Sequence, residues 1–258
     1  MYPMNPQADY YFLLAAKYDL MSTYFKYHDP ACHIHYYQKH LQAMQQAFMC
    51  LNQGKYRFER PTDDVTKAKV RVLHASPDAP AVDIYVDGQK VLQGVFFKQY
   101  SEYLDVPVGP HTIEVYPAGQ MNQPVLRENV TVMPSVYYTL AATGTLNDLD
   151  LQPVVDKPFV EYGQTKARFV HLSPNAPAVD IVTKRGDVLF SEIAFRDSSP
   201  YQNVPSGKVD LQVIVSGTNN VALEVPTLTL LPNTAYSIYA VGLAGGSPAL
   251  DALVLKDS

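Results

Sequence analysis

The chain has 258 residues, which at roughly 100 to 200 residues per domain is enough for two or three structural units. Its net charge of -5 and its pI near 5.8 leave no basic field that would attract nucleic acid, so we expect no nucleic-acid partner. Apolar residues make up 47% of the chain and charged residues 17%, a balance that excludes an intrinsically disordered protein.

Neither a transmembrane segment nor a secretory signal is predicted. No run approaches the ~20 consecutive apolar residues of a membrane helix. The N-terminus has Asp9 and no basic residue before Lys17, and no small-residue cleavage site follows an apolar core. We therefore expect synthesis in the cytoplasm without a signal peptide.

Residues 1–57 predict a helical hairpin. Asn5-Pro6 and Asp29-Pro30 each place an N-cap residue before a proline at the first helical position. Gly54 is expected to end the second helix. Apolar side chains recur at spacings of three and four, giving Tyr11, Leu14, Ala15, Tyr18, Met21 and Phe25 on the first helix and Ile34, Tyr37, Leu41, Met44, Phe48 and Leu51 on the second.

Two helices alone bury too little apolar surface to be stable, so the hairpin must pack on something. One candidate is the neighbouring β unit. The other is a second copy of the hairpin, because the 3-4 spacing suits helix-to-helix packing over about three heptads. Both alternatives stay open from the sequence, and other protein subunits are the expected partners.

The cysteines of the chain, Cys32 and Cys50, fall on the second predicted helix. At ~1.5 Å per residue they stand about 27 Å apart, which is beyond the reach of a disulfide. They are therefore either reduced thiols or candidates for cross-linking between molecules. His28 and His35 flank Cys32, but Asp29-Pro30 interrupts the helical spacing, so we expect no metal site and no cofactor.

The remainder of the chain is a tandem repeat of one sequence unit. The signature H-x-S-P-x-A-P-A-V-D occurs at 74–83 and again at 171–180, and V-P-x-G follows each copy at 106–109 and 204–207. The predicted organisation is a hairpin over 1–57, a linker over 58–67, a first β repeat over 68–155, a linker over 156–165 and a second β repeat over 166–258. Pro158 and Gly163 suit an exposed connector, so we expect the repeats to move relative to each other.

Alternating apolar residues and regular turns predict six or seven short strands per repeat. Asp87-Gly88 marks a hairpin in the first repeat, and Lys184-Arg185-Gly186 a longer one in the second. Tyr236 ends an L-x-P-x-T-x-Y run and Tyr138 ends the matching run of the first repeat, as in a tyrosine corner. The fold class is therefore mainly β, with two tandem immunoglobulin-like β-sandwich domains behind an α-helical hairpin.

The two copies of the signature, each followed downstream by the V-P-x-G motif, resemble the bacterial domain-of-unknown-function family 4397. The resemblance covers residues 68–258. It implies β-sandwich modules that often occur in tandem on bacterial surfaces, and it implies no catalytic residue.

His74, Ser76, Asp78 and Asp83 include the side-chain types of a hydrolytic triad. However, Pro77 follows the serine directly, and the second copy has Asn175 in place of Asp78. We therefore interpret the signature as structural. His74 and His171 are expected to donate hydrogen bonds to a loop, and Ser76 and Ser173 to cap turns. Pro77 and Pro174 would stiffen the A-P-A bend, and Asp83 and Asp180 would hold it in place.

The expected function is a non-enzymatic structural or assembly protein of a bacterial surface layer, such as a spore coat or exosporium, onto which it would be deposited. Self-association through the N-terminal helices would serve that role. The alternative is a carbohydrate- or peptide-binding adhesin with a glycan as ligand, because loops on a rigid sandwich commonly bind. Its weakness is the absence of tryptophan, which stacks best on sugar rings.

Overall fold

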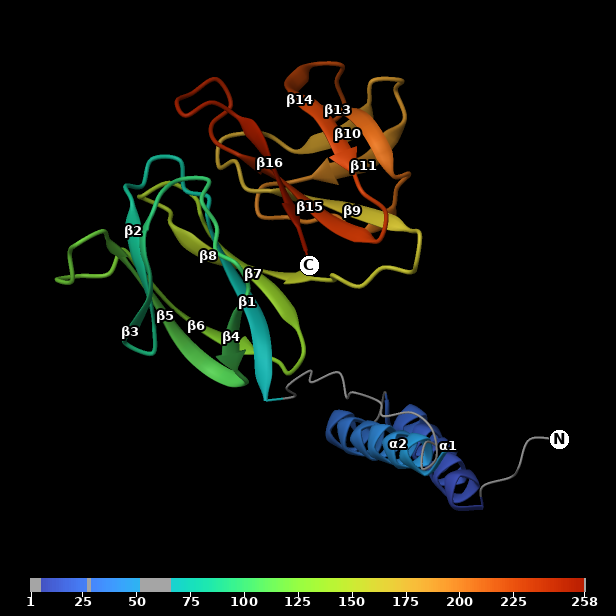
Figure 1. The fold of residues 1–258 in the computed structure, drawn as a ribbon. Helices are drawn as coiled ribbons and strands as arrows, with labels where there is room; N and C mark the ends of the chain where they lie inside the picture. The colour runs from blue at the N-terminus through green and yellow to red at the C-terminus, as the bar shows by residue number, and fades with distance from the viewer. Residues whose placement is uncertain (1–5, 27–28, 52–65, 258) are drawn as a thin grey trace. The chain divides into compact units, whose positions relative to one another are not determined.

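The computed structural model describes residues 6–26, 29–51 and 66–257. The chain divides into two compact units, 1–62 and 63–258 (Figure 1). None of the helices in the described ranges is long and apolar enough to cross a membrane.

The first unit is a pair of helices, α1 (Pro6–Phe25) and α2 (Pro30–Leu51). Asp29 caps α2 as predicted, because its Oδ1 accepts a hydrogen bond from the Cys32 backbone N–H at 3.0 Å and Pro30 occupies the first helical position. Asn5 and Gly54 lie outside the described residues.

The predicted apolar stripe of α1 faces α2. Ala15 is buried, and the rings of Tyr18 and Phe25 both stack on Tyr36. The five other residues of that stripe are half-buried. The α1 pattern is therefore confirmed as the inner face of the hairpin.

The predicted stripe of α2 is not its inner face. Ile34, Tyr37, Leu41 and Phe48 are each about half exposed, with 49% to 56% of their surface accessible. A second stripe, one residue out of phase and also spaced by three and four, packs against α1 instead: His33, Tyr36, His40, Ala43, Ala47 and Cys50.

Two physical features select this second stripe. Its alanines let the helices approach closely, and its histidines bond to the backbone of α1. His33 Nδ1 lies 2.9 Å from the Ser22 carbonyl oxygen, and His40 Nδ1 lies 3.0 Å from that of Ala15. Spacing alone could not distinguish two stripes with the same period.

The second unit contains two β-sandwiches, each built from two four-stranded sheets. The first sandwich has the sheets β4-β1-β7-β8 and β3-β2-β5-β6. Its strands are β1 (Lys67–His74), β2 (Val82–Val86), β3 (Gln89–Val95), β4 (Leu104–Pro107), β5 (Gly109–Pro117), β6 (Leu126–Val132), β7 (Tyr137–Thr143) and β8 (Asp150–Asp156).

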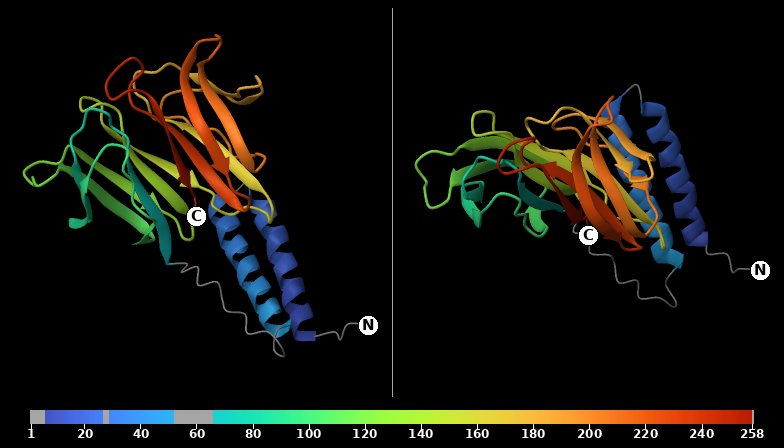
Figure 2. Two further views of the ribbon diagram at one scale, coloured as in Figure 1. Left: turned by 45° about the horizontal axis from the view of Figure 1, so that its top comes forward. Right: turned by 90° about the horizontal axis from the view of Figure 1, so that it is seen from above.

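The second sandwich repeats this order as β12-β9-β15-β16 and β11-β10-β13-β14. Figure 2 shows both sandwiches from two further sides. Its strands are β9 (Thr165–His171), β10 (Val179–Thr183), β11 (Val188–Ile193), β12 (Gln202–Asn203), β13 (Gly207–Val215), β14 (Val221–Leu230), β15 (Thr234–Val241) and β16 (Asp251–Lys256). In both sandwiches the first strand pairs in parallel with the seventh.

The prediction of two tandem β-sandwiches behind a helical hairpin is confirmed. The strand count was too low, because each repeat has eight strands rather than six or seven. The strand order also differs from the seven-stranded immunoglobulin arrangement, since the first strand here lies between the fourth and the seventh.

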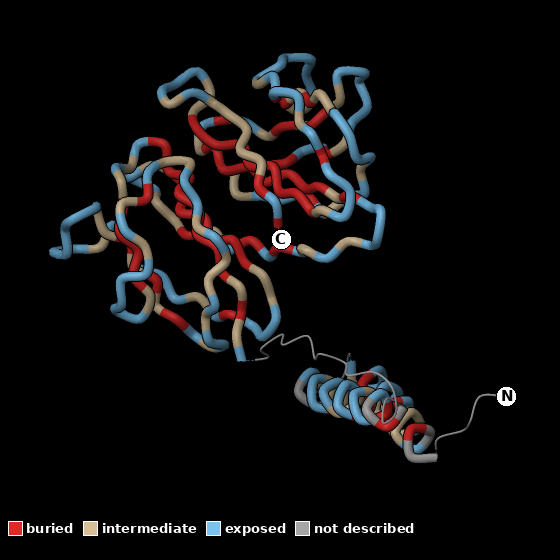
Figure 3. Tube along the Cα trace, viewed as in Figure 1, coloured by how far each residue is buried: buried red, intermediate tan, exposed pale blue. Residues whose placement is uncertain are grey.

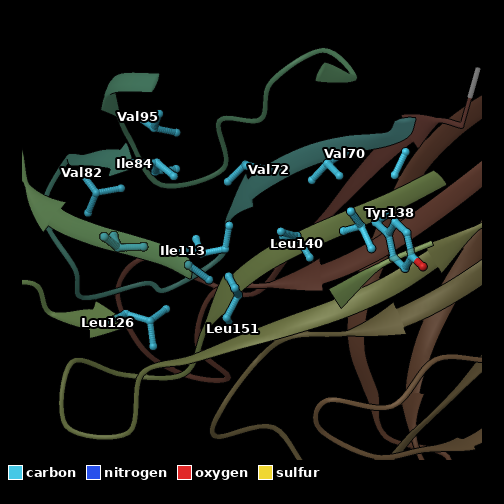
Figure 4. Close-up of a cluster of buried hydrophobic side chains, with 14 residues drawn as sticks. Val70, Val72, Val82, Ile84, Val95, Ile113, Leu126, Tyr138, Leu140 and Leu151 are labelled. Carbon is cyan, nitrogen blue, oxygen red and sulfur yellow. The ribbon is translucent and has the colours of Figure 1, made fainter. Parts of the chain in front are cut away.

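Each sandwich has its own core between its two sheets. In the first, Val72 and Leu140 of one sheet meet Ile84 and Ile113 of the other (Figure 4). The second core lies at the equivalent place and includes larger side chains; it is formed chiefly by Phe169, Ile181, Phe190, Leu211 and Ile238.

The two sandwiches also share a third core. Strands β7 and β15 are buried along nearly their whole length (Figure 3), as expected for strands covered on both faces. Successive residues of β7 point into different cores. Leu140 packs in the core of the first sandwich, whereas Ala141 packs in the shared cluster with Val170, Leu172 and Tyr239. The expectation of independently moving repeats is therefore wrong, because separating them would expose this cluster.

Candidate functional site

The doubled signature forms the end of β1 or β9 and the loop that follows. His74 and His171 are almost completely buried, at 1% and 0% exposure. In each, Nε2 lies 3.1 Å from the carbonyl oxygen of the second proline of the bend, Pro80 or Pro177. Burial lowers the pKa of both imidazoles, so each is neutral and donates its Nε2–H to that carbonyl.

The signature serines are bonded to groups other than a histidine base. Ser76 Oγ–H donates to Asp78 Oδ1 at 3.3 Å, and Ser173 Oγ–H donates to the Gly242 carbonyl at 2.7 Å. Both serines are fully buried. Neither hydroxyl is paired with a base as a nucleophilic serine requires.

The signature aspartates hold a different element from the one expected. Asp83 accepts hydrogen bonds from the Gly94 N–H at 2.8 Å and from Lys90 Nζ at 2.7 Å, and Lys90 lowers its pKa. Asp180 accepts from the Glu192 N–H at 2.7 Å. Gly94 and Glu192 occupy matching positions with positive φ, 63° and 56°. The aspartates therefore secure a kink in the third strand of each sandwich, and the histidines hold the proline bend.

The paired tyrosines close equivalent corners. The Met133 N–H donates to Tyr138 Oη at 3.2 Å, and the Leu231 N–H donates to Tyr236 Oη at 2.9 Å. Each bond spans five residues of the chain. Both phenol groups thus tie the start of the seventh strand to the end of the sixth.

Sequence reasoning missed a buried ion network between the repeats. Arg71 of the first repeat binds Asp257 of the second, with Nη2 at 2.8 Å from Oδ1, and donates Nη1–H to the Lys256 carbonyl at 2.8 Å. Arg168 of the second repeat binds Asp156 of the first and donates to the Val155 carbonyl at 2.7 Å. The two repeats exchange equivalent ion pairs.

The surroundings of these pairs are also duplicated. Each arginine lies over a tyrosine of its own repeat: Arg71 is 4.7 Å from the centre of Tyr103, and Arg168 is 4.6 Å from that of Tyr201. Each tyrosine then donates its hydroxyl to the aspartate of its own repeat, at 2.6 and 2.7 Å. Burial raises the pKa of Asp156, although Arg168 opposes this shift.

A second exchange lies at the rim of the same contact. Lys98 of the first repeat pairs with Asp251 of the second at 2.6 Å. Its counterpart Arg196 pairs with Asp150 of the first repeat at 3.6 Å. Such exchange is the property of an isologous interface, in which the same surface of two copies meets itself. The contact therefore has the form of a dimer interface enclosed within one chain.

A signal for this network was present in the sequence. Arg71 and Arg168 occupy the same place in the two matching strands, each directly between two apolar residues, and Arg71 lies on the face opposite the core-directed Val70 and Val72. A charge at a strand position that should be buried indicates a buried partner.

The cysteines of the hairpin are not joined by a disulfide. The hydrogen bond with Asp29 and the nearby charge raise the pKa of the Cys32 thiol, which lowers its reactivity near neutral pH. Cross-linking through Cys32 and Cys50 stays a prediction. His28 lies outside the described residues, and within those ranges no group of three histidine, cysteine or acidic side chains could hold a metal ion.

Three solved structures are similar over part of the chain. The Bacillus anthracis TIE protein is 10% identical with a TM-score of 0.24, and the match covers 69% of this chain but 34% of that one. A DUF3823 family protein from Bacteroides ovatus is 10% identical with a TM-score of 0.20, covering 64% and 97%. A proposed cell adhesion protein from Bacteroides ovatus is 10% identical with a TM-score of 0.19, covering 74% and 96%.

The chain thus spans about a third of the length of the TIE protein. These TM-scores are too low to carry a functional argument. None of the curated proteins compared with the chain matches it. The family described as Domain of unknown function (DUF4397) matches residues 68–182 and 182–258, and the chain belongs to this family.

Proposed function

We propose that the chain is a non-enzymatic structural or assembly protein of a bacterial surface layer, with the spore coat or exosporium as its specific setting. The observation that carries the proposal is the contact between the repeats, which joins two sandwiches into one rigid unit through a shared apolar core and exchanged ion pairs. A stiff double module suits a load-bearing or spacing role.

The hairpin supplies the means of assembly. Ile34, Tyr37, Leu41 and Phe48 of α2 form an apolar stripe at 3-4-7 spacing that stays about half exposed, although the Phe48 ring contacts Phe12 of α1 edge-on at 5.8 Å. Leu13 and Leu20 of α1 are more than 70% exposed. Apolar side chains repeated at this spacing are typical of helix-to-helix contacts, so the hairpin pairs with a second copy.

The mass of the protein in solution tests the assembly step. Leu41→Glu places a charge in the stripe, and Gln42→Glu places the same charge at the next position of α2, which is exposed and polar. The wild type and the Gln42→Glu variant are expected to form oligomers, whereas the Leu41→Glu variant is expected to be a monomer. A monomeric wild type would contradict self-association through the hairpin.

The location is tested in the source organism. Spore and cell-surface fractions are extracted with and without reductant and probed for this chain. Recovery in a surface fraction, with release increased by reductant, would support surface deposition and cross-linking through Cys32 or Cys50. Recovery in the cytoplasmic fraction alone would contradict the proposal.

The adhesin alternative has one observation in its favour. Phe159 and Tyr162 on the connector between the sandwiches are 72% and 96% exposed, and exposed rings of this kind stack on sugars or peptides. Specific binding on a glycan array that is lost in the Tyr162→Ser variant would favour this function over a purely structural one.

A further inference from the structure

The second sandwich has a cavity of about 320 Å³ at one end, between its two sheets. Its floor is apolar and is formed by Ala167, Phe190, Leu211, Leu230 and Ile238, each with at most 4% of its surface exposed. Its mouth is framed by the turn after β10 and by the turn before β13. A volume of this size falls within the range of small-molecule sites in proteins.

The first sandwich has the same fold but almost no cavity at this place. The corresponding space is about 20 Å³. Val70 stands where the second repeat has Ala167, and His111 stands where it has Val209. The His111 ring is held across the first cavity by Asp87, whose Oδ2 lies 2.6 Å from Nδ1.

The cavity is therefore opened by side-chain replacement within a duplicated backbone. Two copies of one domain with the same strand order differ in whether this end is filled, and the second copy has the smaller residue at both positions. Cores are normally packed without voids of this size, so the second repeat is suited to an occupant.

The mouth of the cavity favours an anion. Its lining has three basic side chains, Lys184, Arg185 and Lys208, against two carboxylates, Asp187 and Asp210, so its formal charge is positive. Each carboxylate also accepts a hydrogen bond from a threonine. Arg185 and Lys208 are exposed at the mouth, and neither side chain forms an ion pair with a described residue, whereas Lys184 pairs with Glu224 at 3.6 Å.

We propose that this cavity binds a small anionic amphiphile, a carboxylate carried on an apolar tail. The tail would occupy the floor beside Ala167, and the carboxylate would bond to Arg185 and Lys208 at the mouth. At about 30 Å³ per non-hydrogen atom, the share of a water molecule in the liquid, the cavity accommodates roughly ten such atoms. The site does not depend on the structural role proposed above.

Decanoate is a suitable probe, with decanol and decyltrimethylammonium as neutral and cationic probes of the same tail length. All three are titrated below their micelle-forming concentrations into the full chain, and methyl NMR signals are followed. Decanoate is expected to bind most tightly and to shift the methyl signals of Leu211 and Ile238. Absence of decanoate binding, or equal binding of all three probes, would overturn the proposal.

Variants separate the tail site from the charge site. Ala167→Leu fills the floor and is expected to abolish binding, and Ala167→Val, which introduces the residue of the first repeat, is expected to weaken it. The double variant Arg185→Gln with Lys208→Gln is expected to weaken decanoate binding about tenfold or more and to leave decanol binding unchanged. Arg127→Gln, on the exposed surface of the first sandwich, is the control and is expected to bind as the wild type does.

The urea midpoint of each variant shows whether it is folded. If the Ala167→Leu variant is unfolded, the Ala167→Val variant carries the test of the tail site. Unchanged decanoate affinity in the folded floor variant, or in the double charge variant, would show that the probe binds elsewhere and would overturn the assignment.

Discussion

The buried ion network between the repeats gives the sharpest prediction. Replacing Arg168 by methionine leaves the Asp156 carboxylate, whose side chain has 0% exposure, without its main cationic partner. Removing one partner of a buried ion pair costs about 3 to 5 kcal/mol of unfolding free energy, because the remaining charge is desolvated and uncompensated. The lower end is expected here, since Arg71 lies 3.6 Å from the same carboxylate.

The rim of the same contact provides the control. Lys98→Met breaks the Lys98–Asp251 pair, which also joins the two repeats but is 34% and 45% exposed. An exposed pair contributes about 1 kcal/mol or less. Both variants are compared with the wild type by urea unfolding, followed by far-ultraviolet circular dichroism and tyrosine fluorescence.

The double variant Arg168→Met with Asp156→Leu removes both charges at once. It is expected to be more stable than the Arg168→Met variant, because no charge is left buried without its partner. If Arg168→Met costs no more than Lys98→Met, the buried network does not hold the repeats together and the reasoning is refuted.

Three further predictions concern single positions. In the folded protein the pKa values of His74 and His171 lie below the ordinary 6.5, so below about pH 6.5 the unfolded chain binds more protons than the folded one. The melting temperature should therefore fall as the pH drops below about 6.5, and a His171→Gln variant should show a smaller fall. Tyr236→Phe removes the corner hydrogen bond and should cost about 1 kcal/mol in urea unfolding, and no loss would contradict its role. Gly242→Ala should be clearly more destabilising than Gly88→Ala in a thermal melt, because both have positive φ but only at Gly242 would the added carbon meet the backbone of Ala249, at the other end of the same β15–β16 loop.

The sequence alone was sufficient for features that depend on short-range spacing. The shared H-x-S-P-x-A-P-A-V-D signature at 74–83 and 171–180 established the duplication, and the period of the apolar residues separated helices from strands. The capping of α2 by Asp29 followed from one dipeptide, because an N-cap is satisfied within its own turn.

Only the tertiary structure decided which long-range contacts these elements make. Two stripes of α2 have the same period, and the small residues and histidine bonds of one of them select it as the inner face. Arg71 and Asp257 are separated by 186 positions, and no local pattern connects them. The contact between the repeats and the open cavity of the second repeat depend on how surfaces fit in space, which spacing along one chain does not encode.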